Sequence, residues 1–369
     1  WSNIRSYNYD ASKKKVTAWY GDSDFAFDGS NGEVLTFIPG FWYKREVVDG
    51  VEYQYISKYE QDGYSYSEPF SVGRYKISRA SSLSNTSSND NGKIELMGAV
   101  TGNRDTGDFD INTENISSRS GAKPLTYKKI GYFREYASKL GSDFSILDYH
   151  YYILQMLYLV EYADYDSQTK LGLGVTNNSV GTIIGGTDEL GMKSGCSAND
   201  GAHSIIYRGI EDIYGNTVDF LDGINIRNYQ AYINYDFTTY WSDAYDGNYK
   251  ALGYANKSFT GVYGSGWITK LGYDSNNPLI SLPTEIDATN TDESNPTGIK
   301  DGYYSGGTIL VVGGSCFVFS RSYLAGLWFS YAADGSRDYH KFVGSRLIRH
   351  QTSGGRGVTN PQEGSSSGK

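Results

Sequence analysis

Apolar and polar positions alternate along the first part of the chain, which is the pattern of β-strands with one buried face. Residues 37–44 and 51–56 form two such runs on either side of Asp49-Gly50. This dipeptide favours the type I′ turn of a two-residue hairpin. Alternation returns at residues 72–78. We therefore expect a hairpin and further strands within residues 16–78.

The pattern changes to helical spacing in the middle of the chain. A first helix is predicted by four apolar residues on one face: Ile130, Phe133, Ala137 and Leu140. Gly141 follows where a left-handed C-cap is expected. A second helix is predicted to begin near residues 145–148, which resemble a capping box, and to end at about Ala163. No helix is predicted after Asp164.

The remaining segments are strand-like or irregular. Residues 80–121 are rich in Ser, Asn, Asp and Gly with little apolar periodicity, so we interpret them as a long surface excursion. Short strand-like pieces fill residues 171–290, and a β-rich segment covers residues 308–349. Two helices between β-rich ends predict an α+β fold. Residues 352–369 are rich in Gly and Ser, which is typical of a flexible tail or linker.

Composition narrows the classes of function. The 42 acidic and 33 basic residues give a formal net charge of -9, which disfavours binding to phosphate backbones, so no nucleic-acid partner is expected. The longest apolar stretch, residues 151–160, is too short to span a bilayer, and no membrane insertion is expected. The chain begins at Trp1 without an initiator Met, so we interpret it as a processed chain or a fragment.

Cysteine and histidine offer little support for a metal centre or a hydrolase. Cys196 and Cys316 lie 120 positions apart, which excludes a disulfide scaffold and a four-thiolate zinc site. The four histidines share no ligand spacing: His150, His203, His340 and His350. No G-x-S-x-G elbow opens a helix, so no hydrolase is expected. The 35 tyrosines fit either a β-rich composition or tyrosine-lined binding surfaces, and both interpretations stay open.

One turn carries candidate cation ligands. Residues 211–220 place three carboxylates and an Asn around a glycine. Crowded oxygen ligands suit a hard cation such as Ca²⁺. The alternative is a capped turn whose Asn and Asp side chains bond to local backbone groups. Asp212 and Asp219 are the residues that distinguish the two.

Five short motifs in order resemble a known superfamily. They are IPGFWYK (38–44), GRYKIS (73–78), GIEDIYGNTVDFLDGINI (209–226), GGSCF (313–317) and VGSRL (343–347), with the predicted helix pair after the second. The series resembles the C-type-lectin-like fold of formylglycine-generating-enzyme relatives. It is more closely similar to phage tail receptor-binding proteins and to the variable proteins of diversity-generating retroelements. The resemblance implies a lectin-like domain over residues 31–350, an N-terminal flank (1–30) and a flexible tail or linker (351–369).

The chain also departs from the pattern of that superfamily. Val218 and Phe220 replace two tryptophans, Val312 replaces an arginine, and Cys316 stands where a tryptophan is usual. An oxidase of the formylglycine type needs two neighbouring cysteines, because Cu(I) prefers soft sulfur ligands. Only Cys316 lies in that region, so neither a copper site nor an enzyme activity is expected.

The resemblance gives the 211–220 turn a specific ligand set. Relatives bind Ca²⁺ through the turn that precedes a G-N-x-x-E motif. Carried over residue by residue, Asp212 and Asp219 supply side-chain oxygens, and Gly215 and Thr217 supply carbonyl oxygens. We therefore treat Ca²⁺ as a possible cofactor.

The resemblance further implies a recognition segment at residues 315–341. In retroelement-diversified relatives this stretch is the part that varies, and its side chains here suit adaptable contact surfaces. We expect Leu327, Trp328 and Phe342 to complete the core. The candidate ligand-binding residues are Cys316, Val318, Ser320, Arg321, Tyr323, Phe329, Tyr331, Asp334, Arg337, Asp338, Tyr339 and His340.

A phage-tail adhesin is the function that follows from this resemblance. It would bind a host cell-surface protein or glycan and contact other tail proteins, at the virion tail tip or another extracellular surface. Several copies would gain avidity, so a homotrimer is expected. One alternative is a structural tail or baseplate module, in which residues 315–341 are buried in subunit contacts. The other is a degenerate formylglycine-type oxidase, which predicts that Cys196 and Cys316 lie close together.

Overall fold

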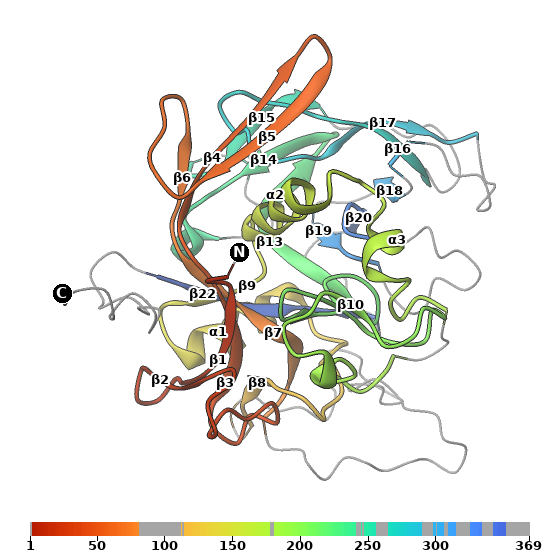
Figure 1. The fold of residues 1–369 in the computed structure, drawn as a ribbon. Helices are drawn as coiled ribbons and strands as arrows, with labels where there is room; N and C mark the ends of the chain where they lie inside the picture. The colour runs from red at the N-terminus through yellow and green to blue at the C-terminus, as the bar shows by residue number, and fades with distance from the viewer. Residues whose placement is uncertain are drawn as a thin grey trace, which may run out of the picture.

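The described part of the protein is mostly β in the computed structural model, with three α-helices and several antiparallel sheets (Figure 1). The structure describes residues 2–80, 112, 114–177, 181–240, 245, 247–255, 265–289, 298–299, 301–305, 309–314, 325–333 and 342–351. Strands dominate both ends of the chain, as the α+β expectation requires, but the described helices form a smaller part of the fold than the strands.

A seven-stranded antiparallel sheet joins the two ends of the described chain. Its strands, in spatial order, are β2 (Lys15–Trp19), β1 (Arg5–Asp10), β3 (Glu33–Ile38), β7 (Phe70–Arg79), β22 (Arg346–His350) and β9 (Phe144–Ile146), with β8 (Ile116–Ser118) paired to β7. The closing strand β22 therefore lies between β7 and β9. Strands β1 and β2 come from the predicted N-terminal flank, and β1 pairs directly with β3.

A nine-stranded sheet forms the other half of the fold. Its main path is β15 (Lys250–Ala255), β14 (Gln230–Ile233), β13 (Val218–Arg227), β19 (Ile309–Val312), β20 (Ser330–Ala333), β18 (Gly302–Ser305), β16 (Ser265–Leu271) and β17 (Pro283–Asp287). The short strand β21 (Val343–Gly344) runs parallel to the start of β13. Strand β13 thus pairs with β19 in the middle of the sheet and with β21, the two residues that precede β22 by one position.

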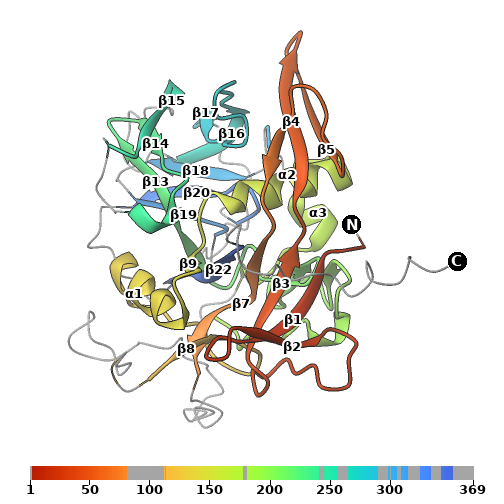
Figure 2. The same ribbon diagram turned by 90° about the vertical axis from the view of Figure 1, so that its left-hand side faces the viewer.

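Two small three-stranded sheets complete the β-structure. One contains β10 (Gly195–Cys196), β11 (Ile205–Tyr207) and β12 (Ile210–Glu211), and the other contains β5 (Val51–Ser57), β4 (Phe41–Val48) and β6 (Ser65–Ser67). The predicted hairpin is confirmed as β4 and β5. Asp49 and Gly50 have φ values of 52° and 79°, the left-handed pair that a type I′ turn needs. The hairpin projects away from the rest of the molecule (Figure 2).

The helices confirm the predicted pair and correct its details. Helix α1 (Ile130–Leu140) forms as predicted, but Gly141 has φ 161°, so the expected left-handed cap is wrong. Helix α2 (His150–Tyr162) begins later than predicted, because residues 144–146 pair with β22 as β9. A short third helix, α3 (Ser167–Leu171), was not predicted. Its N-cap Asp166 accepts a hydrogen bond from the Thr169 amide.

Most central strands are buried on both faces. In β13, Val218 and Phe220 face one hydrophobic cluster, whereas Leu221 and Ile224 face the other. Strand β19 also lies between the two clusters, and its sequence, ILVV, is entirely apolar because a strand between two cores has no solvent-facing side. The described part of the predicted surface excursion differs from expectation, since strand β8 is fully buried. The hydrophobic core therefore includes more of the chain than the alternating sequence patterns predicted.

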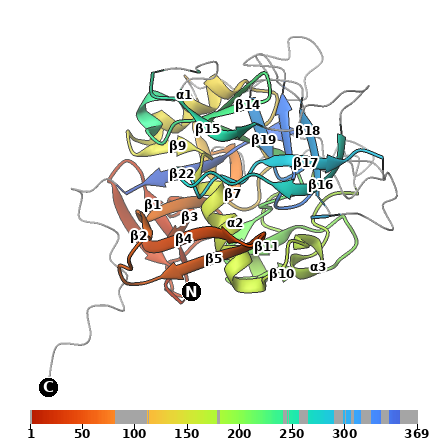
Figure 3. The same ribbon diagram turned by 90° about the horizontal axis from the view of Figure 1, so that it is seen from above.

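Helix α2 lies in the middle of the molecule, beside the β4–β5 hairpin (Figures 1 and 3). Every residue from His150 to Tyr158 is buried. Leu327, Trp328 and Phe342 are also buried, which confirms that they complete the core. Among the described residues, no helix combines the length and apolar character needed to cross a bilayer.

Candidate functional site

Most of the predicted recognition residues lie outside the described part of the chain. These are Cys316, Val318, Ser320, Arg321, Tyr323, Asp334, Arg337, Asp338, Tyr339 and His340. Two are described. Phe329 is buried in a core cluster, which differs from the exposed position that a contact residue needs, and Tyr331 is partly buried in β20 against the same cluster. Neither side chain therefore supplies an open contact surface by itself.

The described residues around the recognition segment are firmly attached to the fold. Before the segment, Gly313 accepts a hydrogen bond from the Gly215 amide at 2.9 Å, and after it Phe342 accepts one from the Val218 amide at 2.9 Å. In its middle, the Leu327 carbonyl accepts hydrogen bonds from two α2 side chains: Tyr151 Oη at 2.8 Å and Gln155 Nε2 at 2.7 Å. The segment is thus fixed before, within and after residues 315–341.

Asp219 of the predicted calcium turn belongs to a buried ion cluster. We define this cluster as Asp219, Lys76 of β7 and Arg346 of β22. Asp219 Oδ2 lies 3.0 Å from Lys76 Nζ and 3.1 Å from Arg346 Nε, and all three side chains are at most 2% exposed. Arg346 also donates to the Asp212 carbonyl at 2.7 Å. Two cations beside Asp219 repel a third, so this geometry favours a structural turn over a calcium site.

The other predicted calcium ligands are buried in the same turn. Asp212 Oδ2 accepts hydrogen bonds from Ser204 Oγ at 3.1 Å and Asn216 Nδ2 at 2.9 Å. Asn216 thus bonds to a neighbouring side chain and to the backbone of distant Thr182, not to the local backbone groups of the capped-turn alternative. Gly215 has φ 81°, and Thr217 is buried. Within the described residues, Asp212 Oδ1, Asp219 Oδ1 and Thr217 Oγ1 make no hydrogen bond. Calcium binding stays a prediction.

Burial changes the titration of this turn. It raises the pKa of Glu211 to about 8, with the neighbouring Asp212 carboxylate adding to the effect. Burial also raises the pKa of Asp212, although Lys76 and Arg346 oppose it. Glu211 accepts hydrogen bonds from Thr187 Oγ1 and from the Gly185 amide. These contacts are with protein groups, so the raised pKa values reflect a packed structural site.

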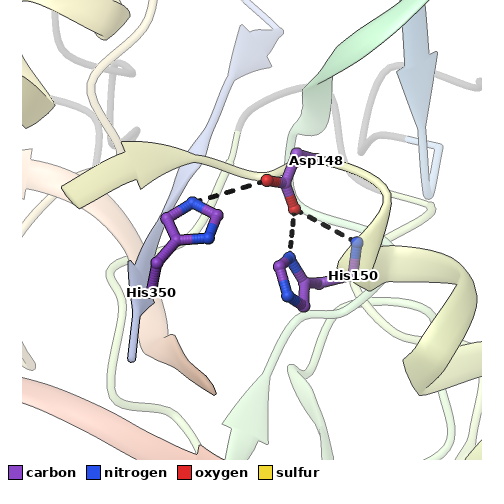
Figure 4. A group of neighbouring side chains, drawn as sticks. All are labelled: Asp148, His150 and His350. Atoms are coloured by element: carbon purple, nitrogen blue, oxygen red, sulfur yellow. Dashed lines mark hydrogen bonds and ion pairs between the residues drawn. The ribbon is translucent and has the colours of Figure 1, made fainter. Parts of the chain in front are cut away.

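A second buried cluster of polar side chains lies at the start of α2 (Figure 4). We define the Asp148 cluster as Asp148, His150 and His350. Asp148 Oδ1 lies 2.6 Å from His150 Nδ1, and Asp148 Oδ2 lies 3.6 Å from His350 Nε2. One ligand atom from each residue lies within 4.8 Å of the other two. Asp148 sits between β9 and α2, His150 opens α2, and His350 ends β22.

Aromatic rings hold both imidazoles in place. The His150 ring lies between Phe70 and Tyr149, with centroid distances of 4.1 and 4.2 Å. The His350 ring stacks on Phe237 at 3.6 Å with an interplanar angle of 4°. Because each ring is packed on a face, its nitrogens keep a fixed direction toward Asp148.

The electrostatics of the Asp148 cluster follow from its burial. Burial alone raises the pKa of the Asp148 carboxyl, but the His150 and His350 imidazoles outweigh it and hold that pKa below its usual value. Tyr240 Oη also donates a hydrogen bond to Asp148 Oδ2 at 3.0 Å. Burial lowers the pKa of His350 to about 4 against the attraction of Asp148. His350 is therefore neutral near pH 7, the form in which imidazole binds metals.

A cavity of about 420 Å³ lies beside the Asp148 cluster. Ser145, Phe237 and Tyr240 line it and also contact the cluster. Two further lining residues form a bidentate ion pair, in which Arg134 reaches both Asp222 oxygens at 2.6 and 2.7 Å. The cavity therefore lies close to the buried cluster, but Asp148, His150 and His350 do not line it themselves.

The arrangement does not support a hydrolytic relay. Ser145 Oγ lies 2.8 Å from His350 Nε2, as a nucleophile and base would. Asp148 approaches the same ring nitrogen, Nε2. In a Ser-His-Asp relay the serine and the carboxylate contact opposite nitrogens of the imidazole. The chemistry that this donor set supports is metal coordination by two nitrogens and an oxygen.

The sequence analysis missed this cluster. The four histidines show no ligand spacing, and His150 and His350 lie 200 positions apart. They meet because β22 pairs with β9, directly before α2. The only local signal is Asp148 two residues before His150, and a lone D-x-H is too common to carry a prediction. Exposed His203 pairs with Asp200 elsewhere, and His340 lies outside the described residues.

Tyrosines lie both in the core and on the surface, and tyrosine-lined binding stays a prediction. Six of the largest fully buried side chains are tyrosines: Tyr7, Tyr75, Tyr151, Tyr158, Tyr207 and Tyr214. Others are exposed on or beside the hairpin sheet: Tyr53, Tyr55, Tyr59 and Tyr66. Tyr165, Tyr254 and Tyr273 line a cavity of about 640 Å³ where the hairpin meets the nine-stranded sheet. Tyrosine thus builds the core and also one projecting surface.

Cys196 carries a free, half-buried thiol. Burial raises the pKa of this thiol, so it is poorly suited to the thiolate form that copper needs. Cys316 lies outside the described residues, and the expected distance between the two sulfurs stays a prediction.

Comparison with protein-family models finds no matching family, and comparison with curated proteins finds no matching relative. The function must therefore be argued from the residues and the fold.

Proposed function

We propose that the protein is a host receptor-binding adhesin of a phage tail, built on a C-type-lectin-like fold. It uses the side chains of residues 315–341 to contact a cell-surface protein or glycan, and it catalyses no reaction. The proposal places the protein at the virion tail tip, in contact with other tail proteins, as a homotrimer.

The observation that carries the proposal is the attachment of the recognition segment to buried structure. Gly313 and Phe342 are held by the amides of Gly215 and Val218, on either side of Thr217. Leu327 is held by α2. Contact residues between such fixed points can change without opening the core, because the anchors and not the contacts carry the packing.

The course of the chain supports a lectin-like fold. Strand β22 returns to the sheet that contains β1, β3 and β7, so the described chain closes a loop on itself. Helices α1 and α2 lie within that loop in sequence. The Arg346 side chain of the VGSRL motif joins this closing strand to the buried ion cluster. Three of the quoted motifs, GRYKIS, GIEDIYGNTVDFLDGINI and VGSRL, thus meet in one place through Lys76, Asp219 and Arg346.

Sequences of sibling isolates test the proposed function. A recognition role predicts that substitutions concentrate between Cys316 and His340, while Leu327 and Trp328 stay constant because they fill the core. An even spread of substitutions along the chain would count against the adhesin.

The hairpin sheet favours a second candidate, a structural tail or baseplate module. Seven large apolar or aromatic side chains on or beside this sheet are exposed: Val47, Val48, Val51, Tyr53, Tyr55, Tyr59 and Tyr66. Such a surface is typical of a protein contact. Light scattering on the wild type and on a Val48→Lys/Val51→Lys variant tests this role. Loss of assembly in the variant, together with no cell binding by the wild type, favours the structural module over the adhesin.

A further inference from the structure

We propose that Asp148, His150 and His350 form a binding site for one divalent transition-metal ion of the zinc type. The site is separate from the recognition segment and does not rest on the proposed function. Its ligands would be the Asp148 carboxylate, whose Oδ1 faces His150 and whose Oδ2 faces His350, and one nitrogen from each imidazole.

The donor set selects the class of metal. Zinc and its neighbours accept histidine nitrogen together with carboxylate oxygen, and three protein ligands plus an open position are typical of zinc sites with solvent access. Calcium takes six to eight oxygen ligands instead. The nitrogens of His150 and His350 therefore favour a zinc-type ion over the calcium predicted for the 211–220 turn.

Two of the ligand distances fit such an ion after a small adjustment, and the three ligand atoms lie within 4.8 Å of one another. Ligand atoms of a tetrahedral zinc ion lie roughly 3.3–3.5 Å apart, given bonds of about 2.0–2.1 Å. Asp148 Oδ2 and His350 Nε2 are already 3.6 Å apart. Asp148 Oδ1 and His150 Nδ1 share a hydrogen bond at 2.6 Å, so they must separate by less than about 1 Å as the ion replaces the shared proton.

The surroundings supply the outer contacts that metal ligands need. Tyr240 Oη donates to Asp148 Oδ2, and a hydrogen bond to a ligating carboxylate fixes its orientation. Phe70, Tyr149 and Phe237 pack on the imidazole faces and so restrict their rotation.

The local charge also favours a cation. Asp148 is fully buried, and Arg134, the arginine that lines the adjoining cavity, is engaged with Asp222. Because Arg134 is paired with Asp222, a divalent ion could balance the negative charge of the buried Asp148 carboxylate. Ser145 and Tyr240 line the cavity and contact the cluster, so the cavity lies one residue away from the ligands.

Metal titration of the full chain tests the site. The protein is stripped with EDTA, dialysed, and titrated with Zn²⁺ by calorimetry and with Co²⁺ by visible absorption. We expect one equivalent of each ion to bind, and the intense visible bands of four- or five-coordinate Co²⁺ to appear. Excess Ca²⁺ should not displace either ion. Absence of stoichiometric binding in the wild type would overturn the proposal.

Two variants locate the ion. His350→Phe keeps a ring to stack on Phe237 but removes the nitrogen ligand, and we expect at least tenfold weaker Zn²⁺ binding. His203→Phe is the matched control, because His203 also pairs with an aspartate but is exposed and distant in sequence. Unchanged affinity in His350→Phe, or an equal loss in His203→Phe, contradicts the site.

A measurement on the wild type covers the case in which His350→Phe fails to fold. X-ray absorption of the zinc-loaded protein should show scattering from two imidazole rings and oxygen ligands. A spectrum without imidazole scattering rules out His150 and His350 as ligands and overturns the proposal.

Discussion

Asp219 and Arg346 form a buried ion pair, with 3.1 Å between Asp219 Oδ2 and Arg346 Nε, although 127 positions separate them in sequence. The pair joins β13 to the closing strand β22, and Lys76 adds a contact from β7 to the same Asp219 oxygen. One carboxylate thus connects the two large sheets.

Asp219→Asn should lower the free energy of unfolding by about 3–5 kcal/mol, because it leaves the buried Lys76 and Arg346 cations without their counter-ion. Urea unfolding measures the change. Glu285→Gln is the control, since it breaks the exposed Lys270–Glu285 pair and should cost at most about 1 kcal/mol. Similar losses in the two variants would show that the buried ion cluster does not hold the sheets together.

Glu33 predicts a specific pH dependence of stability. Burial raises the pKa of Glu33 to about 7 in the folded protein, whereas the exposed side chain of the unfolded chain has a pKa of 4.5. Between these values the folded protein binds more protons than the unfolded chain, so stability falls as the pH rises through this window and levels off above it. The full effect is about 3 kcal/mol. Glu33→Gln should remove this fall.

The comparison of wild type and Glu33→Gln isolates that effect from other titrating groups. Thermal unfolding at several pH values from 4 to 9 should show the variant gaining stability relative to the wild type as the pH rises. Two parallel stability curves would mean that Glu33 does not titrate as its burial indicates.

Substitution of Gly313 tests whether the attachment before the recognition segment is needed for stability and receptor binding. The φ of Gly313 is 88°, and an added Cβ would lie 2.9 Å from the Ile213 carbonyl oxygen. Gly313→Ala should therefore destabilise the protein by about 1–3 kcal/mol through backbone strain and overlap. It should also weaken receptor binding. Chemical denaturation and cell binding measure the two effects.

Gly50 is the matched control for Gly313. It has a similar φ of 79°, but an added Cβ would meet nothing within 4 Å. Gly50→Ala should show only the strain of the left-handed conformation, about 1–2 kcal/mol, with cell binding unchanged. If Gly313→Ala were no more harmful than Gly50→Ala in both assays, the attachment at Gly313 would have no special role.

Local signals in the sequence predicted local structure well. Asp49-Gly50 identified the hairpin, and the spacing from Ile130 to Leu140 identified α1. The predicted start of α2 at residues 145–148 was wrong, because this capping-like sequence also fits a strand and pairs with β22. Helix α3 is only five residues long, and its periodicity is too short to detect.

The candidate site depends on contacts that no local pattern contains. The sequence identified Asp212 and Asp219 as residues of interest, but it could not show that Lys76 and Arg346 occupy the oxygen of Asp219. It could not bring His350 to Asp148 either, because that requires the pairing of β22 with β9. Strand order decides both sites, and strand order is a property of the whole fold.

Binding of labelled protein to bacterial isolates tests the central claim most directly. Flow cytometry compares the wild type with a variant in which residues 316–324 and 334–340 are replaced by Gly and Ser, while the anchor residue Leu327 is kept. A control variant carries the same replacement over residues 84–99, which has the same total length. The account predicts that the wild type and the control stain a subset of isolates, and that the first variant loses staining while its unfolding temperature is retained. Undiminished staining by a folded first variant would contradict the account.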